Sequence, residues 1–391
     1  MRLAVGAGVV AWAIVSACTS SNDENKGQQA DRAHTSDAAL DSGATMDAPA
    51  TVDASNASDA SDAGTEEPCD AGRECPLGCR AGRCLVLTPS NLPPDICDTP
   101  GTKDFTGGDL RWDPDAIIHQ IGGPDIYLYK FAHVSGDLSG FFPRITAIVA
   151  TDSMQLGSAP SAPTNMGLGE AGEQAAWNCG AGGAGYGTPG GPQVTYNGTF
   201  IDPAHGSETA IPLLLGRSGG TARDIDNVLP ALGGSGGSAL QLVSCGTLTI
   251  TGHLSVDGFA PERGSRLAAG GGGGSGGTLL IEAASVRAAP SSSLSSNGGA
   301  GGPGLARDGD RPGGVTVPGG AGGTATSPPG ADTCGTGEEL PGSYPGGRIL
   351  ACGAGAGGAV GRIRINVAAG TQPELLGRAS PAPSIGTIAT H

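Results

Sequence analysis

The stretch GGGGSGGTLLIE, residues 271–282, joins a run of glycine directly to an apolar run with strand character. A near copy, GGSGGSALQLVS, occupies residues 233–244, and the two align at a shift of forty residues. Farther along the same alignment, Leu254 matches Leu294 and Gly258 matches Gly298. Residues 357–367 resemble a third copy, in which apolar and polar residues alternate. Such self-similarity is typical of a repetitive architecture that stacks one unit on the next.

The repeat predicts an all-β fold, a parallel β-helix or solenoid with long glycine-rich loops. In such a coil, short strands of each turn lie about 4.8 Å from those of the preceding turn. A long and narrow aliphatic core explains how a chain with 72 glycines and only 4% aromatic residues can fold. We expect glycines such as Gly258 and Gly298 to supply positive φ angles at the corners of the coil.

Two other structures are compatible with the glycine runs. They can form extended helices of the polyglycine II kind, since that form suits a backbone without side chains. They can also be disordered Gly/Ser/Pro segments, a reading that suits residues 298–348 better than residues 236–258.

The amino terminus has the features of an export signal. Arg2 precedes an apolar run from Leu3 to Val15, which is too short to cross a bilayer of about 30 Å as a helix. The residues VSAC that end at Cys18 resemble the bacterial lipobox. That resemblance implies cleavage after residue 17, a diacylglycerol on Cys18 and attachment to a membrane. The alternative is an ordinary signal peptide cut near Ala17, with Cys18 a plain thiol.

Residues 18–67 are predicted to form a disordered tether. Residues 22–67 carry eleven acidic and two basic residues, a net charge of −9, and few large apolar groups. Such a segment cannot bury enough apolar surface to offset its ordering entropy, and like charges keep it extended. The tether would hold residues 98–391, the predicted β-helix-like domain, away from the membrane.

The cysteines predict disulfides, because an exported chain matures in an oxidising environment. Five lie in the cysteine-rich segment 68–97, and their spacing lacks the paired pattern of a zinc site. Four more lie among the glycines, and Cys334 and Cys352 could close one loop or pair elsewhere. The disulfide candidates are Cys69, Cys75, Cys79, Cys84, Cys97, Cys179, Cys245, Cys334 and Cys352.

The pattern of residues 68–368 resembles the glycine-rich repeat lipoproteins common in myxobacteria. The resemblance rests on the cysteine cluster followed by LTPSNLP (87–93), on IPLLLGRSGG (211–220) and on the repeats themselves. It implies a protein located at the outer membrane or cell surface with a scaffold role.

Catalytic, cofactor and metal motifs are weak throughout the chain, and we expect none of these sites. The pattern G-x-S-x-G occurs at 216–220, 233–237 and 273–277, but it precedes strands instead of helices. The remaining patterns lack the surroundings that their chemistry needs: GLGEAG at 167–172, the pairs Asp224/Asp226 and Asp308/Asp310, and the scattered His119, His133, His205 and His253.

The sequence therefore predicts a structural or adhesive surface lipoprotein without enzymatic activity. Its partners would be a membrane, through the lipid, and an extracellular polysaccharide or further copies of the chain. The lack of a basic patch argues against nucleic acid. The alternative is a carbohydrate-active β-helix enzyme, a lyase or a hydrolase, but residues 201–391 contain only two aromatic residues and no lysine.

Overall fold

Long strands begin where the glycine runs end. β11 (Ala239–Ile250) follows Gly236 and Gly237, and β13 (Thr278–Ala288) follows Gly276 and Gly277. The computed structural model describes residues 75, 77, 79–80, 83–110, 114–139, 145–159, 180–195, 198–222, 231–261, 270–307, 315–317, 320–324, 350–351 and 354–391. These residues contain strands and no helix, and all of them lie in the unit Glu66–His391.

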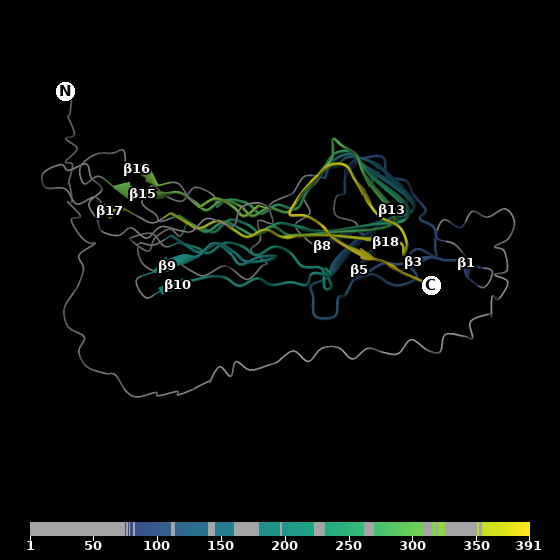
Figure 1. Cartoon of the computed structure of the whole chain (residues 1–391), viewed down its shortest axis with the longest axis horizontal. Helices are drawn as coiled ribbons and strands as arrows, with labels where there is room; N and C mark the ends of the chain where they lie inside the picture. Colours follow the sequence, from purple (N-terminus) through teal and green to yellow (C-terminus); the bar gives the residue numbers. More distant parts are fainter. Residues whose placement is uncertain are drawn as a thin grey trace, which may run out of the picture. The chain divides into compact units, whose positions relative to one another are not determined.

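The main sheet of this unit has eight strands and lies at one end of the glycine-rich segments (Figure 1). Its strands, in spatial order, are β21 (Ser384–Thr387), β18 (Arg362–Val367), β13, β11, β8 (Ile145–Leu156), β6 (Ile126–Gly136) and β5 (Ala116–Ile118), and β19 (Glu374–Leu375) also pairs with β13. All neighbours are parallel except β5, which is antiparallel to β6. The prediction of a mostly β fold with parallel strands is confirmed.

The register of the strands lies within two residues of the forty-residue alignment, since β11 and β13 pair at an offset of 39 residues before the irregularity of β11 and of 38 residues after it. Ala239 of β11 lies opposite Thr278 of β13, and Leu279 of β13 lies opposite Ile363 of β18. A second parallel sheet contains β12 (His253–Ser255), β14 (Ser293–Ser295) and β20 (Arg378–Ser380), and in it Leu254 lies opposite Leu294. Leu254 and Leu294, which match in the sequence, are therefore direct neighbours in space, whereas matching residues of β11 and β13 lie one or two positions apart along the strands.

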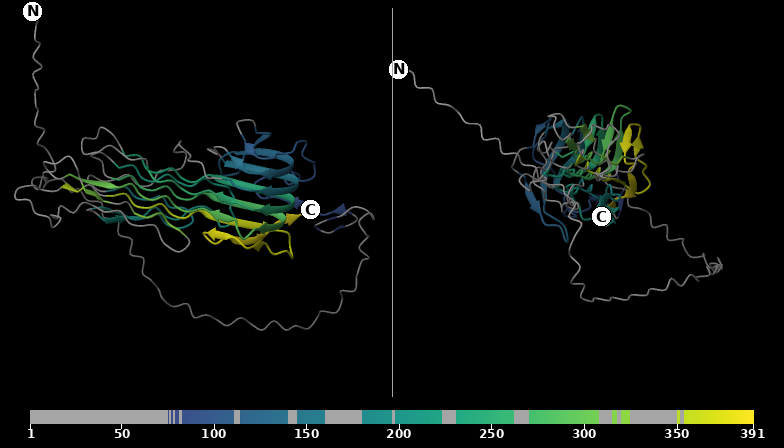
Figure 2. Two further views of the ribbon diagram at one scale, coloured as in Figure 1. Left: turned by 90° about the horizontal axis from the view of Figure 1, so that it is seen from above. Right: turned by 90° about the vertical axis from the view of Figure 1, so that its left-hand side faces the viewer.

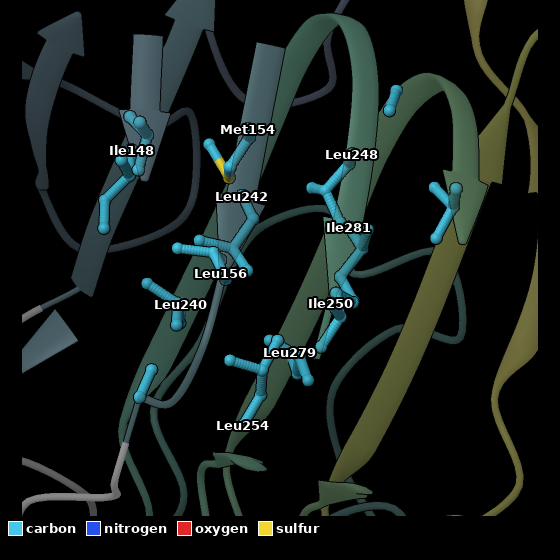
Figure 3. Packing of buried hydrophobic residues seen from close by; sticks show 14 of the residues in the cluster. Ile148, Met154, Leu156, Leu240, Leu242, Leu248, Ile250, Leu254, Leu279 and Ile281 are labelled. Carbon is cyan, nitrogen blue, oxygen red and sulfur yellow. The ribbon is translucent and has the colours of Figure 1, made fainter. Parts of the chain in front are cut away.

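The long strands bend around a narrow aliphatic core. β6 shifts its register against β8 between Phe131 and His133, and β11 does so against β13 between Ser244 and Thr247. Such irregularities bend a strand and change which residues face inward. Leu242 before the bend and Leu248 after it both point into the core, where Figure 3 shows them with Leu254 and Leu279.

The outer face of the sheet is covered as well. Leu92 and Ile96 pack there, together with Leu213, and belong to residues 83–98, which we call the covering segment. They meet residues such as Val149 and Leu280, which alternate with the inward residues of the same strands. Because both faces are buried, the strands read as nearly continuous apolar runs.

Short strands complete the described part. β3 (Leu87–Thr88) pairs antiparallel with β22 (Ala389–Thr390), so the carboxyl terminus meets the start of the covering segment. The other pairings are β1 (Cys79–Arg80) with β2 (Arg83–Cys84), β4 (Gly108–Asp109) with β7 (Leu138–Ser139), β9 (Gln193–Thr195) with β10 (Gly198–Phe200), and β15 (Gly304–Arg307) with both β16 (Val315–Val317) and β17 (Leu350–Ala351).

The glycine-rich segments form a hydrogen-bonded bundle, in which they run side by side away from the sheet (Figure 2). We call this the glycine bundle and define it as residues 180–192, 216–222, 231–238, 256–261, 270–277, 296–302, 320–323 and 354–361. The amides of segment 270–277 donate in turn to three neighbouring segments and then repeat the cycle. The bonds run from the amide of the first residue to the carbonyl oxygen of the second: Gly272 to Gly220 (2.9 Å), Gly273 to Ala356 (2.8 Å), Gly274 to Phe259 (3.0 Å), Ser275 to Arg217 (3.0 Å), Gly276 to Ala359 (2.9 Å) and Gly277 to Val256 (2.8 Å).

A period of three residues in segment 270–277, with bonds that run to neighbouring segments, resembles the arrangement of polyglycine II. The described segments of the bundle are thus glycine-rich connections that bond to one another, which is a feature of the polyglycine II alternative. The predicted role of Gly258 and Gly298 at corners with positive φ is wrong, since neither has a positive φ. A Cβ on Gly298 would lie 1.9 Å from the carbonyl oxygen of Gly358. Glycine is needed here because neighbouring backbones touch, not because the chain turns.

Candidate functional site

Two disulfides are present among the described residues. Cys75, which precedes β1, pairs with Cys84 of β2. Cys97 pairs with Cys245 over a sequence separation of 148 and joins the covering segment to the bend of β11. Cys79 lies in β1. Cys18, Cys69, Cys179, Cys334 and Cys352 lie outside the described residues.

The best-defined polar cluster surrounds the carboxylate of Glu282 on the outer face of β13. Ser90 donates its amide to both carboxylate oxygens, at 3.0 and 3.2 Å, and its hydroxyl to Oε1 at 2.7 Å. Gln241 of β11 donates Nε2 to Oε2 at 2.7 Å, and Asn366 of β18 donates Nδ2 to Oε1 at 3.0 Å. We call these four residues, Ser90, Gln241, Glu282 and Asn366, the Glu282 cluster.

Burial dominates the electrostatics of this cluster. Glu282 is 0% exposed, and this desolvation raises the pKa of its carboxyl group, while the bonds from Asn366, Ser90 and Gln241 act in the opposite direction. None of the ion pairs found among the described residues involves Glu282. The carboxylate is thus held by hydrogen-bond donors from three segments and is closed to solvent.

Sequence reasoning missed this cluster, although one signal was available. Glu282 is the only charged residue in the apolar run TLLIEAASV (278–286), and a carboxylate in a buried strand needs partners. Its partner Ser90 lies 192 residues away in the sequence and could not be identified from spacing.

A second buried group joins the glycine bundle to the sheet. The hydroxyl of Tyr186 donates to the carbonyl oxygen of Leu214 at 3.1 Å and also bonds the hydroxyl of Thr278 at the start of β13. The ring of His205 meets the Tyr186 ring edge-on, with centroids 4.6 Å apart. Burial raises the pKa of Tyr186 to about 12, so its hydroxyl stays neutral at physiological pH.

The serine motifs lie in the glycine bundle and do not form a nucleophile. Ser275 of the motif 273–277 is 0% exposed, and its hydroxyl accepts a bond from the amide of Arg217 at 2.8 Å. The motifs 216–220 and 233–237 are extended segments of the same bundle. Residues 167–172 and the pairs Asp224/Asp226 and Asp308/Asp310 lie outside the described residues.

The other histidines are separated from one another along the fold. His119 bonds Asp125 at 2.7 Å, His133 lies 3.3 Å from Asp152, and His253 bonds Ser293 at 2.6 Å. Across the described ranges, no three His, Cys, Asp or Glu side chains gather closely enough to hold a metal ion. The same part of the chain offers no helix with the length and hydropathy of a membrane span.

Comparisons with protein-family models, with curated proteins and with solved structures find no match for this chain.

Proposed function

We propose that this chain is an exported, lipid-anchored protein that serves as a structural or adhesive scaffold at the outer membrane or cell surface. The main supporting observation is the glycine bundle, in which main-chain groups bond to neighbouring segments in three directions. Backbone hydrogen bonds hold the segments of the bundle together, so the side chains at its outer positions are available to contact ligands. The proposal includes no catalytic step.

The proposed architecture is a parallel β-helix-like coil whose turns are interrupted by the glycine bundle. It is supported by the strand order, which follows the chain in the same way in both parallel sheets. β11, β13 and β18 are neighbours in one sheet, and β12, β14 and β20 are neighbours in the other. The bridge between Ala159 and Leu254 extends the second sheet toward the preceding turn.

The proposed anchor is a lipid on Cys18, followed by the acidic tether 18–67. This part of the proposal is supported by the sequence, in which the apolar run, VSAC and the acidic segment follow one another in the expected order. Several acyl chains would hold the protein stably, whereas one chain alone gives marginal binding.

The proposed ligands are extracellular polysaccharides or further copies of the chain. Outer positions of the bundle, such as Ala300 and Ala321, are exposed and alternate with pairs of buried or half-buried glycines. Exposed backbone beside them offers amide and carbonyl groups to hydroxyl-rich ligands or to another extended chain.

Experiments on living cells that produce the full chain test this function. Mass spectrometry of the mature amino terminus should find acylated Cys18, and protease added to intact cells should remove the domain. Cells with the wild-type chain should retain polysaccharides that cells with Cys18→Ser do not. Release of shortened saccharides by the wild-type chain would instead establish the carbohydrate-active enzyme.

A further inference from the structure

The Glu282 cluster brings a hydroxyl and a carboxamide to one carboxylate. Ser90 donates its hydroxyl to Oε1 of Glu282 at 2.7 Å, and Gln241 donates Nε2 to Oε2 at 2.7 Å. The same Nε2 lies 2.6 Å from the backbone oxygen of Ser90. Gln241 and Glu282 are each 0% exposed, so water is kept from the carboxamide.

We infer that Ser90 and Gln241 become joined by an ester bond within the chain, with Glu282 as the proton carrier. The inference concerns a covalent modification and does not depend on the proposed scaffold role.

The reaction needs no further reactant. Glu282 accepts the proton of the Ser90 hydroxyl as Oγ attacks Cδ of Gln241, and the Oγ–Cδ bond forms. Glu282 then returns that proton to Nε2 as the Cδ–Nε2 bond breaks. One ammonia leaves, the carbonyl of Gln241 becomes the carbonyl of the ester, and Glu282 regains its starting state.

A second link between the same two segments favours this reaction. Cys97 lies seven residues after Ser90, Cys245 lies four residues after Gln241, and the two cysteines form a disulfide. The disulfide holds the segments together before the ester forms, so the hydroxyl and the carboxamide meet as parts of one molecule. Such positioning raises the effective concentration of the reacting groups by large factors.

The surroundings of the two amides single out Gln241 over Asn366. Asn366 also reaches Glu282, but its Oδ1 accepts a bond from Nε of Arg364 at 2.8 Å, so both ends of this amide are held. The Oε1 atom of Gln241 is buried and has no hydrogen-bond partner among the described residues. A buried unpaired acceptor calls for an explanation, and a reactive carboxamide supplies one.

Peptide mapping of the full mature chain tests the ester. Trypsin places Ser90 in peptide 84–103, Gln241 in peptide 224–263 and Asn366 in peptide 365–378. After reduction and alkylation of the disulfides, peptides 84–103 and 224–263 should remain joined and should be lighter by one ammonia than their sum. Hydroxylamine, which cleaves esters, should separate them.

Three variants make the test specific. Ser90→Ala removes the attacking hydroxyl and should abolish the cross-link while the Cys97–Cys245 disulfide still forms, which shows that the domain has folded. Ser292→Ala removes a hydroxyl that bonds Ala289 and should leave the cross-link intact. Glu282→Gln should abolish it by removing the proton carrier. Separate wild-type peptides with an intact Gln241, or a cross-link to peptide 365–378, would overturn the inference.

Discussion

Gly299 lies so close to Phe259 that an added Cβ would be 2.1 Å from the carbonyl oxygen and 2.2 Å from the carbonyl carbon of Phe259. Its neighbour Ala300 is exposed. The two positions belong to the same segment of the glycine bundle and differ only in the direction that they face. Substitutions at these two positions therefore distinguish a specific requirement for glycine from the effect of adding any side-chain atom to this segment.

Gly299→Ala should destabilise the domain, because backbone must move to make room for the methyl group. We expect a loss of about 1–3 kcal/mol or more, as for other overpacked sites. Ala300→Ser adds one atom at the exposed neighbour and should change the free energy of unfolding by less than about 0.5 kcal/mol. Urea unfolding followed by circular dichroism measures both, and equal losses would contradict the close-packed bundle.

The stability of the domain should fall as pH rises through the raised pKa of Glu282. The unfolded carboxyl titrates near 4.5, and burial raises its pKa in the folded state. The folded state therefore binds the proton more tightly, so this stabilisation is complete below pH 4.5 and is lost above the folded pKa. Urea midpoints between pH 4 and 8 should show the trend, and Glu282→Gln should lack it.

Tyr186→Phe should lower stability by about 1 kcal/mol, because a buried hydroxyl loses its bonds to Leu214 and Thr278. In the wild-type protein, the Tyr186 hydroxyl should remain neutral well above pH 10, since its pKa is about 12 in the folded state. The unfolded tyrosine ionises first, so stability falls as pH rises from 10 to 12. Ultraviolet absorbance titration of wild type and Tyr186→Phe should differ by one late-ionising phenol. A difference near pH 10 with the fold intact would contradict the buried site.

Leu242→Ala should cost about 2–5 kcal/mol, because it opens a cavity in the aliphatic core. Leu242 is 0% exposed and lies beside Met154 and Leu156 in the aliphatic core (Figure 3). Ile385→Ala removes a branched aliphatic side chain from the 43% exposed edge position of β21 and should cost far less. Thermal unfolding compares the two variants, and a similar cost at both sites would argue against a single narrow core.

The parallel pairing of the repeat strands was accessible from the sequence, because a repeat places equivalent segments beside one another. The alignment of Leu254 with Leu294 is the register of β12 with β14. The glycine bundle was accessible only in part. Its three-residue period is visible in NGGAGGPG (297–304), where Ala300 and Pro303 are exposed, but we interpreted the glycines as corners and loops.

The sequence by itself determined that alternating aliphatic residues would form parallel strands, since that pattern depends on local periodicity and on the repeat. Only the tertiary structure decided which segments meet. Ser90 reaches Glu282 and Cys97 reaches Cys245 across most of the chain, and no spacing rule connects them. Likewise, a bundle glycine has no side chain to reveal its neighbours, so its role follows solely from the backbones that surround it.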